Sequence, residues 1–131
     1  MNNPYILCVD DDKTILMSLK AQLKYHLGDN FNYEVAESAE EAWEVMNELF
    51  AQGERIAVII SDWIMPNVKG DEFLIDVHAK YPKIIKLILT GHADEVAISR
   101  AKEQANLSGC FVKPWNVDEL IEVIESALES I

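Results

Sequence analysis

Polar side chains follow four of the apolar runs in this sequence, each at the point where the run ends. They are Asp10, Asp11 and Asp12 after the first run, Asp62 after the third, Thr90 after the fourth and Lys113 after the fifth. Taken singly, an Asp in such a place is most often a helix cap or a turn residue, and a Thr or Lys there is usually solvated. Four such places in one chain favour a shared site instead.

The residue types in this set indicate phosphoryl chemistry. Carboxylates that gather at one site repel one another, and a bound cation would relieve the repulsion. Mg2+ prefers one or two carboxylates with water and phosphate oxygens, and the set holds no thiolate or imidazole that would favour zinc. An ionised Asp, with a reference pKa of about 3.9, can attack phosphorus without a general base. A metal, an ammonium and a hydroxyl would stabilise the transferring oxygens, which predicts a Mg2+-dependent aspartyl phosphate.

Five alternating strands and helices are predicted to position these residues. The strands are expected at Tyr5–Val9, Asn32–Ala36, Ile56–Ile60, Ile84–Leu89 and Cys110–Val112. Three of them are almost continuously apolar, which is typical of parallel strands covered on both faces. Helices are expected at Lys13–Leu27, after Ser38, at Gly70–Tyr81, at Glu95–Asn106 and after Asn116. Five βα units in series predict an open α/β sheet whose carboxyl ends share one edge.

Three helices of this series differ in how strongly the sequence supports them. Ser38 and Asn116 stand in N-cap register with Glu41 and Glu119, ahead of clear apolar stripes. The helix at Glu95–Asn106 has a stripe made mainly of alanine, and buried apolar area determines how firmly a helix is held. We therefore expect it to be the least firmly anchored helix.

Composition limits the classes of protein to consider. The chain has 131 residues, half of them hydrophobic, and a net charge of −12. That length predicts one domain over residues 1–131, which could be a whole protein or the N-terminal part of a longer one. The acidic balance disfavours direct binding to nucleic acid or to an anionic membrane. No signal or spanning segment is evident, so a cytoplasmic location is expected, with both cysteines reduced and packed in the core.

The complete pattern resembles the response-regulator receiver family of two-component signalling. The resemblance covers the whole chain in order and rests on four strings: ILCVDDD, SDWIMPNVKGDEFL, ILTGH and FVKPW. It implies a flavodoxin-like, doubly wound (βα)5 fold with strand order 2-1-3-4-5. It also implies a phosphoryl group received from a histidine kinase or phosphotransfer protein, and an output domain or target protein that the sequence does not identify.

The resemblance implies a role for each site residue. Asp62 would be the phosphoacceptor, Asp11 a direct Mg2+ ligand and Asp10 a ligand acting mainly through water. The backbone carbonyl of Ile64 would complete the protein ligands. Thr90 and Lys113 would hold phosphoryl oxygens, and Lys113–Pro114 would be a cis peptide bond. Asp12 falls outside this set and is interpreted as an acid at a helix N-terminus.

Three residues depart from the family pattern. Cys110 stands three residues before Lys113, where the family commonly has the aromatic ring of a rotamer switch. Phe111 is adjacent, but strand residues alternate faces, so its ring is expected on the other side of the sheet. The output is therefore expected to run through the loop after Thr90 and the helix that follows it. Ile64 and His92 flank the expected path of attacking water, where they would affect the lifetime of the phosphoryl group.

The sequence fits two other classes of function less well. Asp10 and Asp12 fit the D-x-D-x-T signature of haloacid-dehalogenase-type phosphatases, but the second acidic pair of that family is missing and the SDWIMP segment would be unexplained. A degenerate receiver that serves only as a protein-binding module is the other alternative. It is disfavoured because every expected site residue is present. The domain is not expected to be an enzyme beyond its own phosphorylation and dephosphorylation.

Overall fold

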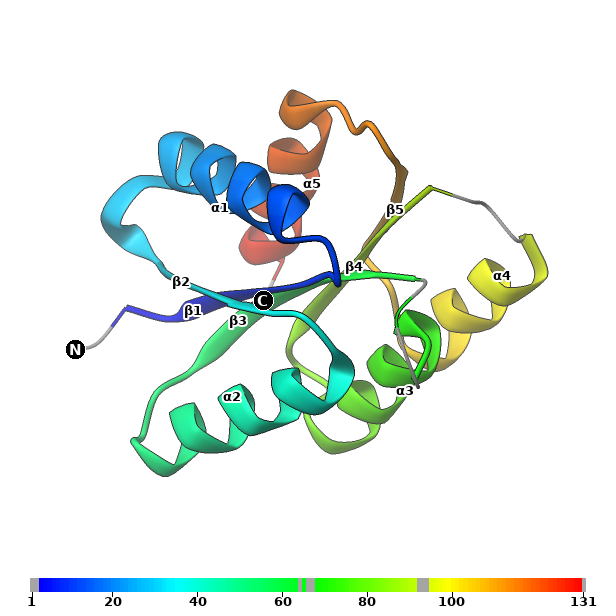
Figure 1. Ribbon diagram of the computed structural model, residues 1–131, viewed down its shortest axis with the longest axis horizontal. Coiled ribbons are helices and arrows are strands. Elements are labelled where there is room, and N and C mark those ends of the chain that lie inside the picture. The colour runs from blue at the N-terminus through cyan, green and yellow to red at the C-terminus, as the bar shows by residue number, and fades with distance from the viewer. Residues whose placement is uncertain (1–2, 64, 66–67, 92–94, 131) are drawn as a thin grey trace.

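Five parallel strands form the centre of the molecule. The computed structural model describes residues 3–63, 65, 68–91 and 95–130. The strands are β1 (Tyr5–Val9), β2 (Asn32–Ala36), β3 (Ile56–Asp62), β4 (Ile85–Thr90) and β5 (Gly109–Val112). They pair in the order β2-β1-β3-β4-β5, which confirms the predicted doubly wound α/β sheet (Figure 1).

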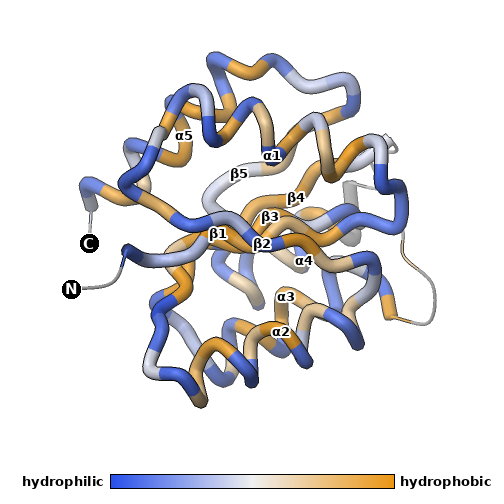
Figure 2. Tube along the Cα trace, turned by 60° about the vertical axis from the view of Figure 1, so that its left-hand side comes forward, coloured by the Kyte–Doolittle hydropathy of each residue, from blue (hydrophilic) through white to orange (hydrophobic). Residues whose placement is uncertain are grey.

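Helices cover both faces of this sheet. They are α1 (Lys13–Leu27), α2 (Ala39–Ala51), α3 (Gly70–Lys80), α4 (Glu95–Gln104) and α5 (Val117–Glu129). Helices α1 and α5 lie on one face, and α2, α3 and α4 lie on the other (Figure 1). Figure 2 shows the hydrophobic strands enclosed between these two layers.

Each face of the sheet has its own core. The core under α1 and α5 includes Ile6, Cys8, Leu19, Leu23, Leu120 and Ile124. The core under α2, α3 and α4 includes Leu7, Val9, Met46, Phe73, Leu74 and Val77. Neighbouring residues of β1 thus alternate between the two cores, and all six residues of β4 are buried. Coverage on both faces explains the continuous apolar runs.

The predicted caps are confirmed by side-chain hydrogen bonds. Asp12 accepts from the backbone N–H of Thr14 and Ile15 at the start of α1. Ser38 accepts from the N–H of Glu41, and Asn116 from the N–H of Glu119, at distances of 3.1 Å each. These bonds satisfy N–H groups that have no partner within the helix, and they define where three helices begin.

The ends of several elements differ from the predicted ones. Strands β3 and β4 extend to Asp62 and Thr90, so these polar residues end their strands rather than follow them. The reason is that backbone pairing, not side-chain polarity, ends a parallel strand, and Asp62 still pairs with Leu89. Helix α4 ends at Gln104 rather than at Asn106, which adopts the left-handed conformation with φ 52°.

Lys86 in the middle of β4 is only 1% exposed. Its Nζ donates to the carbonyl of Ile84, and burial lowers the pKa of its ammonium to about 8. In the unfolded chain that pKa is near 10.5. The unfolded state therefore binds more protons between these two values, and stability rises as pH increases from about 8 to about 10.5.

We expect Lys86→Met to stabilise the domain by about 1–3 kcal/mol at neutral pH, because the buried charge is removed. The gain should shrink towards pH ~10, where Lys86 is largely neutral in the folded protein and its burial no longer requires burying a charge. Urea unfolding of both proteins at the two pH values measures this. Lys83→Met is the matched control, since Lys83 is exposed on the preceding turn. A gain of equal size at both pH values would show that packing, not charge, is responsible.

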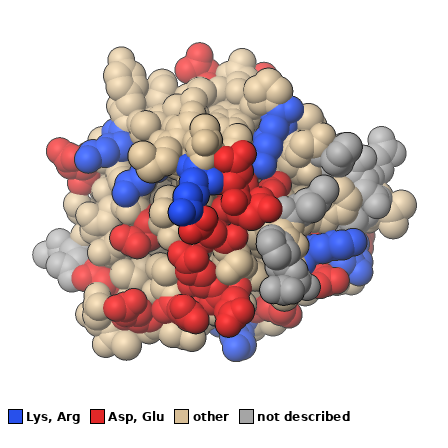
Figure 3. All heavy atoms as spheres, in the orientation of Figure 1, with Lys and Arg blue, Asp and Glu red and all other residues tan. Residues whose placement is uncertain are grey.

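Acidic side chains predominate on the face of the molecule shown in Figure 3, where Lys and Arg are more scattered. This distribution agrees with the net charge of −12. Within the described part of the chain, no helix is long and apolar enough to cross a membrane.

Candidate functional site

Three carboxylates meet at the carboxyl edge of the sheet. One ligand oxygen each from Asp10, Asp11 and Asp62 lies within 4.8 Å of the other two. Asp10 directly follows β1 and Asp62 ends β3, and these two strands are neighbours. Asp10 and Asp62 are buried whereas Asp11 is exposed, so the cluster opens to solvent on one side. The predicted gathering of these residues is confirmed.

The three consecutive acids after β1 have separate positions. The backbone N–H of Asp10 donates to the carbonyl of Ala36, which continues the pairing of β1 with β2. The Oδ1 of Asp10 accepts from the N–H of Asp12 at 2.9 Å, and this holds its carboxylate toward Asp62. The side chain of Asp12 instead caps α1, where it accepts from the N–H groups of Thr14 and Ile15. The interpretation of Asp12 as a helix N-terminal acid is therefore confirmed.

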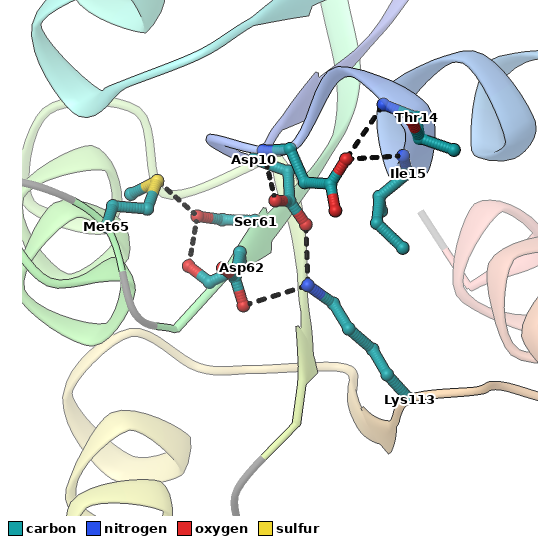
Figure 4. A network of polar contacts seen from close by, with 8 residues as sticks. Asp10, Thr14, Ile15, Ser61, Asp62, Met65 and Lys113 are labelled. Carbon is teal, nitrogen blue, oxygen red and sulfur yellow. Dashed lines mark hydrogen bonds and ion pairs between the residues drawn. The ribbon is translucent and has the colours of Figure 1, made fainter.

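Lys113 joins two of the carboxylates. Its Nζ lies 2.7 Å from Oδ2 of Asp10 and 3.2 Å from Oδ1 of Asp62 (Figure 4). The residue follows β5, and its backbone N–H donates to the carbonyl of Thr90 at 2.7 Å. The Lys113–Pro114 bond is cis, as predicted. An ammonium in this position can contact oxygens bound to Asp62.

The electrostatics of the site show an excess of negative charge. Burial and the neighbouring Asp10 raise the pKa of Asp62, and Lys113 only partly offsets them. Burial disfavours the Lys113 ammonium, but its hydrogen bond to Asp10 and the charges of Asp10 and Asp62 raise its pKa overall. A second cation would relieve the remaining repulsion. The donors are all oxygen atoms and Asp11 faces solvent, which fits a hard divalent ion that keeps several waters, as Mg2+ does.

Thr90 ends β4 beside the cluster and is fully buried. It lies one residue beyond Leu89, the partner of Asp62 in the sheet, and opposite Val112. This register sets Thr90 at the same edge as Asp62. The structure therefore brings together Asp10, Asp11, Asp62 and Lys113, with Thr90 at the adjoining strand end.

The residues expected to differ from the family pattern are only partly described. Ile64 and His92 lie outside the described residues. Cys110 packs against the core under α2, α3 and α4, whereas Phe111 packs against the core under α1 and α5. The predicted alternation is confirmed, so the Phe111 ring cannot occupy the place of the missing aromatic switch. Cys8 and Cys110 are both free thiols, as expected.

Two residues next to Asp62 were not predicted from the sequence. Ser61 is buried, and its Oγ donates to the carbonyl of Asp62 at 2.9 Å. Gly70, the first residue of α3, lies so close to Asp62 that an ideal Cβ there would be 2.0 Å from the same carbonyl oxygen. The glycine in the SDWIMPNVKG string was the only sequence signal for this contact, and it did not indicate the partner.

Comparison with known proteins agrees with the fold and the site. A family model described as the response regulator receiver domain matches residues 6–125. The chain belongs to the response regulator receiver domain family. It is thus a receiver domain of the two-component type, and neither the phosphatase nor the degenerate module has support.

Relatives with curated descriptions include transcriptional regulators and a sensor kinase. The hydrogenase transcriptional regulatory protein HoxA of Cupriavidus necator is 28% identical over 125 residues, which are 95% of this chain and 24% of that protein. The transcriptional regulatory protein GlrR of Escherichia coli is also 28% identical, over 95% of this chain and 26% of its own length. The chain therefore spans about a quarter of the length of these relatives.

Solved structures of receiver domains match over nearly the whole chain. The signal receiver domain of an HD domain-containing protein from Pseudomonas fluorescens has a TM-score of 0.85 at 28% identity, covering 98% of this chain and 97% of the other. The beryllofluoride-activated NtrC4 receiver domain dimer has a TM-score of 0.82 at 26% identity, covering 96% and 97%. Receiver domains generally bind Mg2+ at an acidic cluster and interact with histidine kinases or phosphotransfer proteins.

Proposed function

We propose that Asp62 is the phosphoacceptor of this receiver domain. The observation that carries the proposal is the position of Lys113, whose Nζ contacts both Asp10 and Asp62 within a cluster of three carboxylates. A phosphoryl group on Asp62 would bring oxygens into reach of this ammonium. The same ammonium would stabilise the charge on those oxygens during transfer.

The reaction is a single displacement at phosphorus. An oxygen of the Asp62 carboxylate forms a bond to the phosphorus atom, and the bond from phosphorus to the donor breaks. The donor leaves with its electron pair, as acetate from acetyl phosphate or as neutral imidazole from a protonated phosphohistidine. Lys113 and the Thr90 hydroxyl hold the phosphoryl oxygens. The domain thereby acts on itself and not on a released substrate.

Asp10, Asp11, Asp62 and the carbonyl of Ile64 would hold Mg2+. When bound, this ion would neutralise carboxylate charge and polarise phosphoryl oxygens. Asp11 is the exposed member of the cluster and has room for a metal with its waters, and Asp10 already bonds to Lys113 and to the Asp12 N–H. These contacts favour Asp11 as the direct ligand and Asp10 as a ligand through water.

The wider role follows from the family and from charge. We infer that the domain spans residues 1–131, that its donor is a histidine kinase or phosphotransfer protein, and that it works in the cytoplasm. The output would be a further domain or a target protein. Direct binding to nucleic acid is not proposed, because an acidic surface repels phosphate.

The proposal is tested by incubating the protein with acetyl phosphate, with Mg2+ or with excess chelator. We expect one equivalent of acid-stable, base-labile phosphate, formed only when Mg2+ is present. Steady release of phosphate from generic monoesters, without a labelled protein, would instead favour the phosphatase.

A pair of neighbouring variants tests the metal ligands. Asp11→Ala is expected to weaken Mg2+ binding about tenfold or more, because it removes a direct ligand. Asp12→Ala should leave Mg2+ affinity within about twofold, yet lower stability by about 1 kcal/mol through loss of the cap. Calorimetric titration and urea unfolding measure the two effects. Equal loss of Mg2+ affinity in both variants would require a different ligand set.

A further inference from the structure

A buried carboxylate outside the acidic cluster connects the phosphoacceptor strand to α4. Asp71, the second residue of α3, is 2% exposed. Its Oδ1 accepts from the indole Nε1 of Trp63 at 3.1 Å, and its Oδ2 accepts from Nη2 of Arg100 at 2.7 Å. Trp63 directly follows Asp62, and Arg100 lies in α4. One side chain thus joins the residue after β3, the start of α3 and the middle of α4.

The bonds of Asp71 determine where its neighbours lie. A buried carboxylate is costly unless both oxygens are satisfied, so its two donors are held in position. The backbone adds a second connection, because the N–H of Gly70 donates to the carbonyl of Trp63 at 2.7 Å. Together these bonds fasten the start of α3 to the residue after Asp62.

The described core contacts of α4 on this side are small. Among its described side chains the buried one is Ala101, and Ala105 is buried just beyond its end. Alanine buries little apolar area, so such contacts hold a helix weakly. The charge-assisted bond from Arg100 to Asp71 is directional and stronger than a neutral hydrogen bond. A shift of α4 must stretch or break it.

We propose that Asp71 is a positioning residue that ties α4 to the phosphoacceptor strand end, so that the Arg100 bond sets how readily α4 moves when Asp62 is phosphorylated. This inference rests on the proposed function of Asp62. Trp63 is on the site side of the connection and Arg100 on the output side. Loss of the Arg100 side chain should therefore change the response of α4 to phosphorylation. The response at Trp63 and the phosphorylation of Asp62 should stay unchanged.

The experiment uses beryllofluoride with Mg2+ as the phosphoryl mimic and two readouts on each variant. Amide hydrogen exchange reports α4, and tryptophan fluorescence, with Trp63→Phe to assign the signal of Trp63 among the three tryptophans, reports the site. Arg100→Gln removes the charge. Lys102→Gln is the matched control, since it removes the same charge from an exposed position on the same helix. Arg100→Lys tests rescue.

In Arg100→Gln, exchange of α4 without beryllofluoride should quicken about 3- to 10-fold, and the further change on adding beryllofluoride should largely disappear. The Trp63 fluorescence response and the labelling by acetyl phosphate should stay within about twofold of wild type. Lys102→Gln should behave as wild type, and Arg100→Lys should recover part of the α4 response. A residue that only stabilises the fold would not separate the two readouts in this way.

Two different failures can be told apart. Normal labelling with wild-type α4 exchange in Arg100→Gln would overturn the proposed role of Asp71 alone. Loss of both the α4 exchange response and the Trp63 fluorescence response in this variant would also overturn it. Absence of labelling in the wild-type protein would overturn the proposed function of Asp62 and, with it, this inference.

Discussion

Replacing Asp62 by asparagine is expected to abolish labelling by acetyl phosphate, with a loss of at least about 100-fold, while the fold survives. The amide is nearly the same size as the carboxylate but is not a nucleophile under these conditions. The variant also removes one of three crowded carboxylates, so its Tm should not fall. Radiolabel incorporation and thermal unfolding measure the two properties.

The control for this variant is Asp76→Asn. Asp76 is an exposed residue of α3 that is absent from the acidic cluster, so its variant should be labelled as wild type. Labelling of Asp62→Asn at the wild-type rate would mean that another residue accepts the phosphoryl group. Loss of labelling with a large fall in Tm would indicate unfolding instead.

Gly70→Ala is expected to lower stability by about 3 kcal/mol or more, because the added methyl group overlaps backbone and not a flexible side chain. An ideal Cβ at this position lies 2.0 Å from the carbonyl oxygen of Asp62 and 2.9 Å from the Cα of Trp63. To relieve the overlap, the start of α3 or the end of β3 must move. Displacement of Asp62 by about 1 Å should slow labelling about 100-fold.

Gly91→Ala is the matched control for this substitution. Gly91 is exposed and an added Cβ would meet no atom within 4 Å. Its variant should change stability by less than about 1 kcal/mol. Urea unfolding of both variants compares the two positions. Equal and small losses of stability in the two variants would show that Gly70 does not pack closely against the Asp62 carbonyl.

Local chemistry explains which features could be predicted from the sequence. The N-caps at Asp12, Ser38 and Asn116 depend on residues within three positions, and all three are confirmed. The apolar runs indicated a sheet covered on both faces, and the resemblance supplied the strand order. Once that order is known, the residues that end β1, β3, β4 and β5 must gather at one edge.

Contacts between residues far apart in the chain could not be predicted from local sequence patterns. The bond between Asp71 and Arg100 spans 29 positions and depends on how α3 packs beside α4. A charged residue on a helix is usually solvated, so neither residue indicated a partner. Lys86 had no local signal of burial other than the apolar residues around it. The contact of Gly70 with Asp62 arises from a close backbone approach, which side-chain patterns do not encode.

The missing aromatic switch bears on how the signal leaves the site. Cys110 and Phe111 lie on opposite faces of β5, as their cores show. The expectation that output runs through the loop after Thr90 and through α4 stays a prediction. The connection through Asp71 offers a physical route for it, because it reaches α4 from the residue next to Asp62.

The most direct test of the account is to locate the phosphoryl group. After labelling with acetyl phosphate and Mg2+, reduction with borohydride converts an aspartyl phosphate to homoserine, which tandem mass spectrometry assigns to one position. We predict homoserine at Asp62 alone. Homoserine at Asp10, where a haloacid-dehalogenase-type enzyme would carry its nucleophile, or at Asp11 or Asp12, would contradict it.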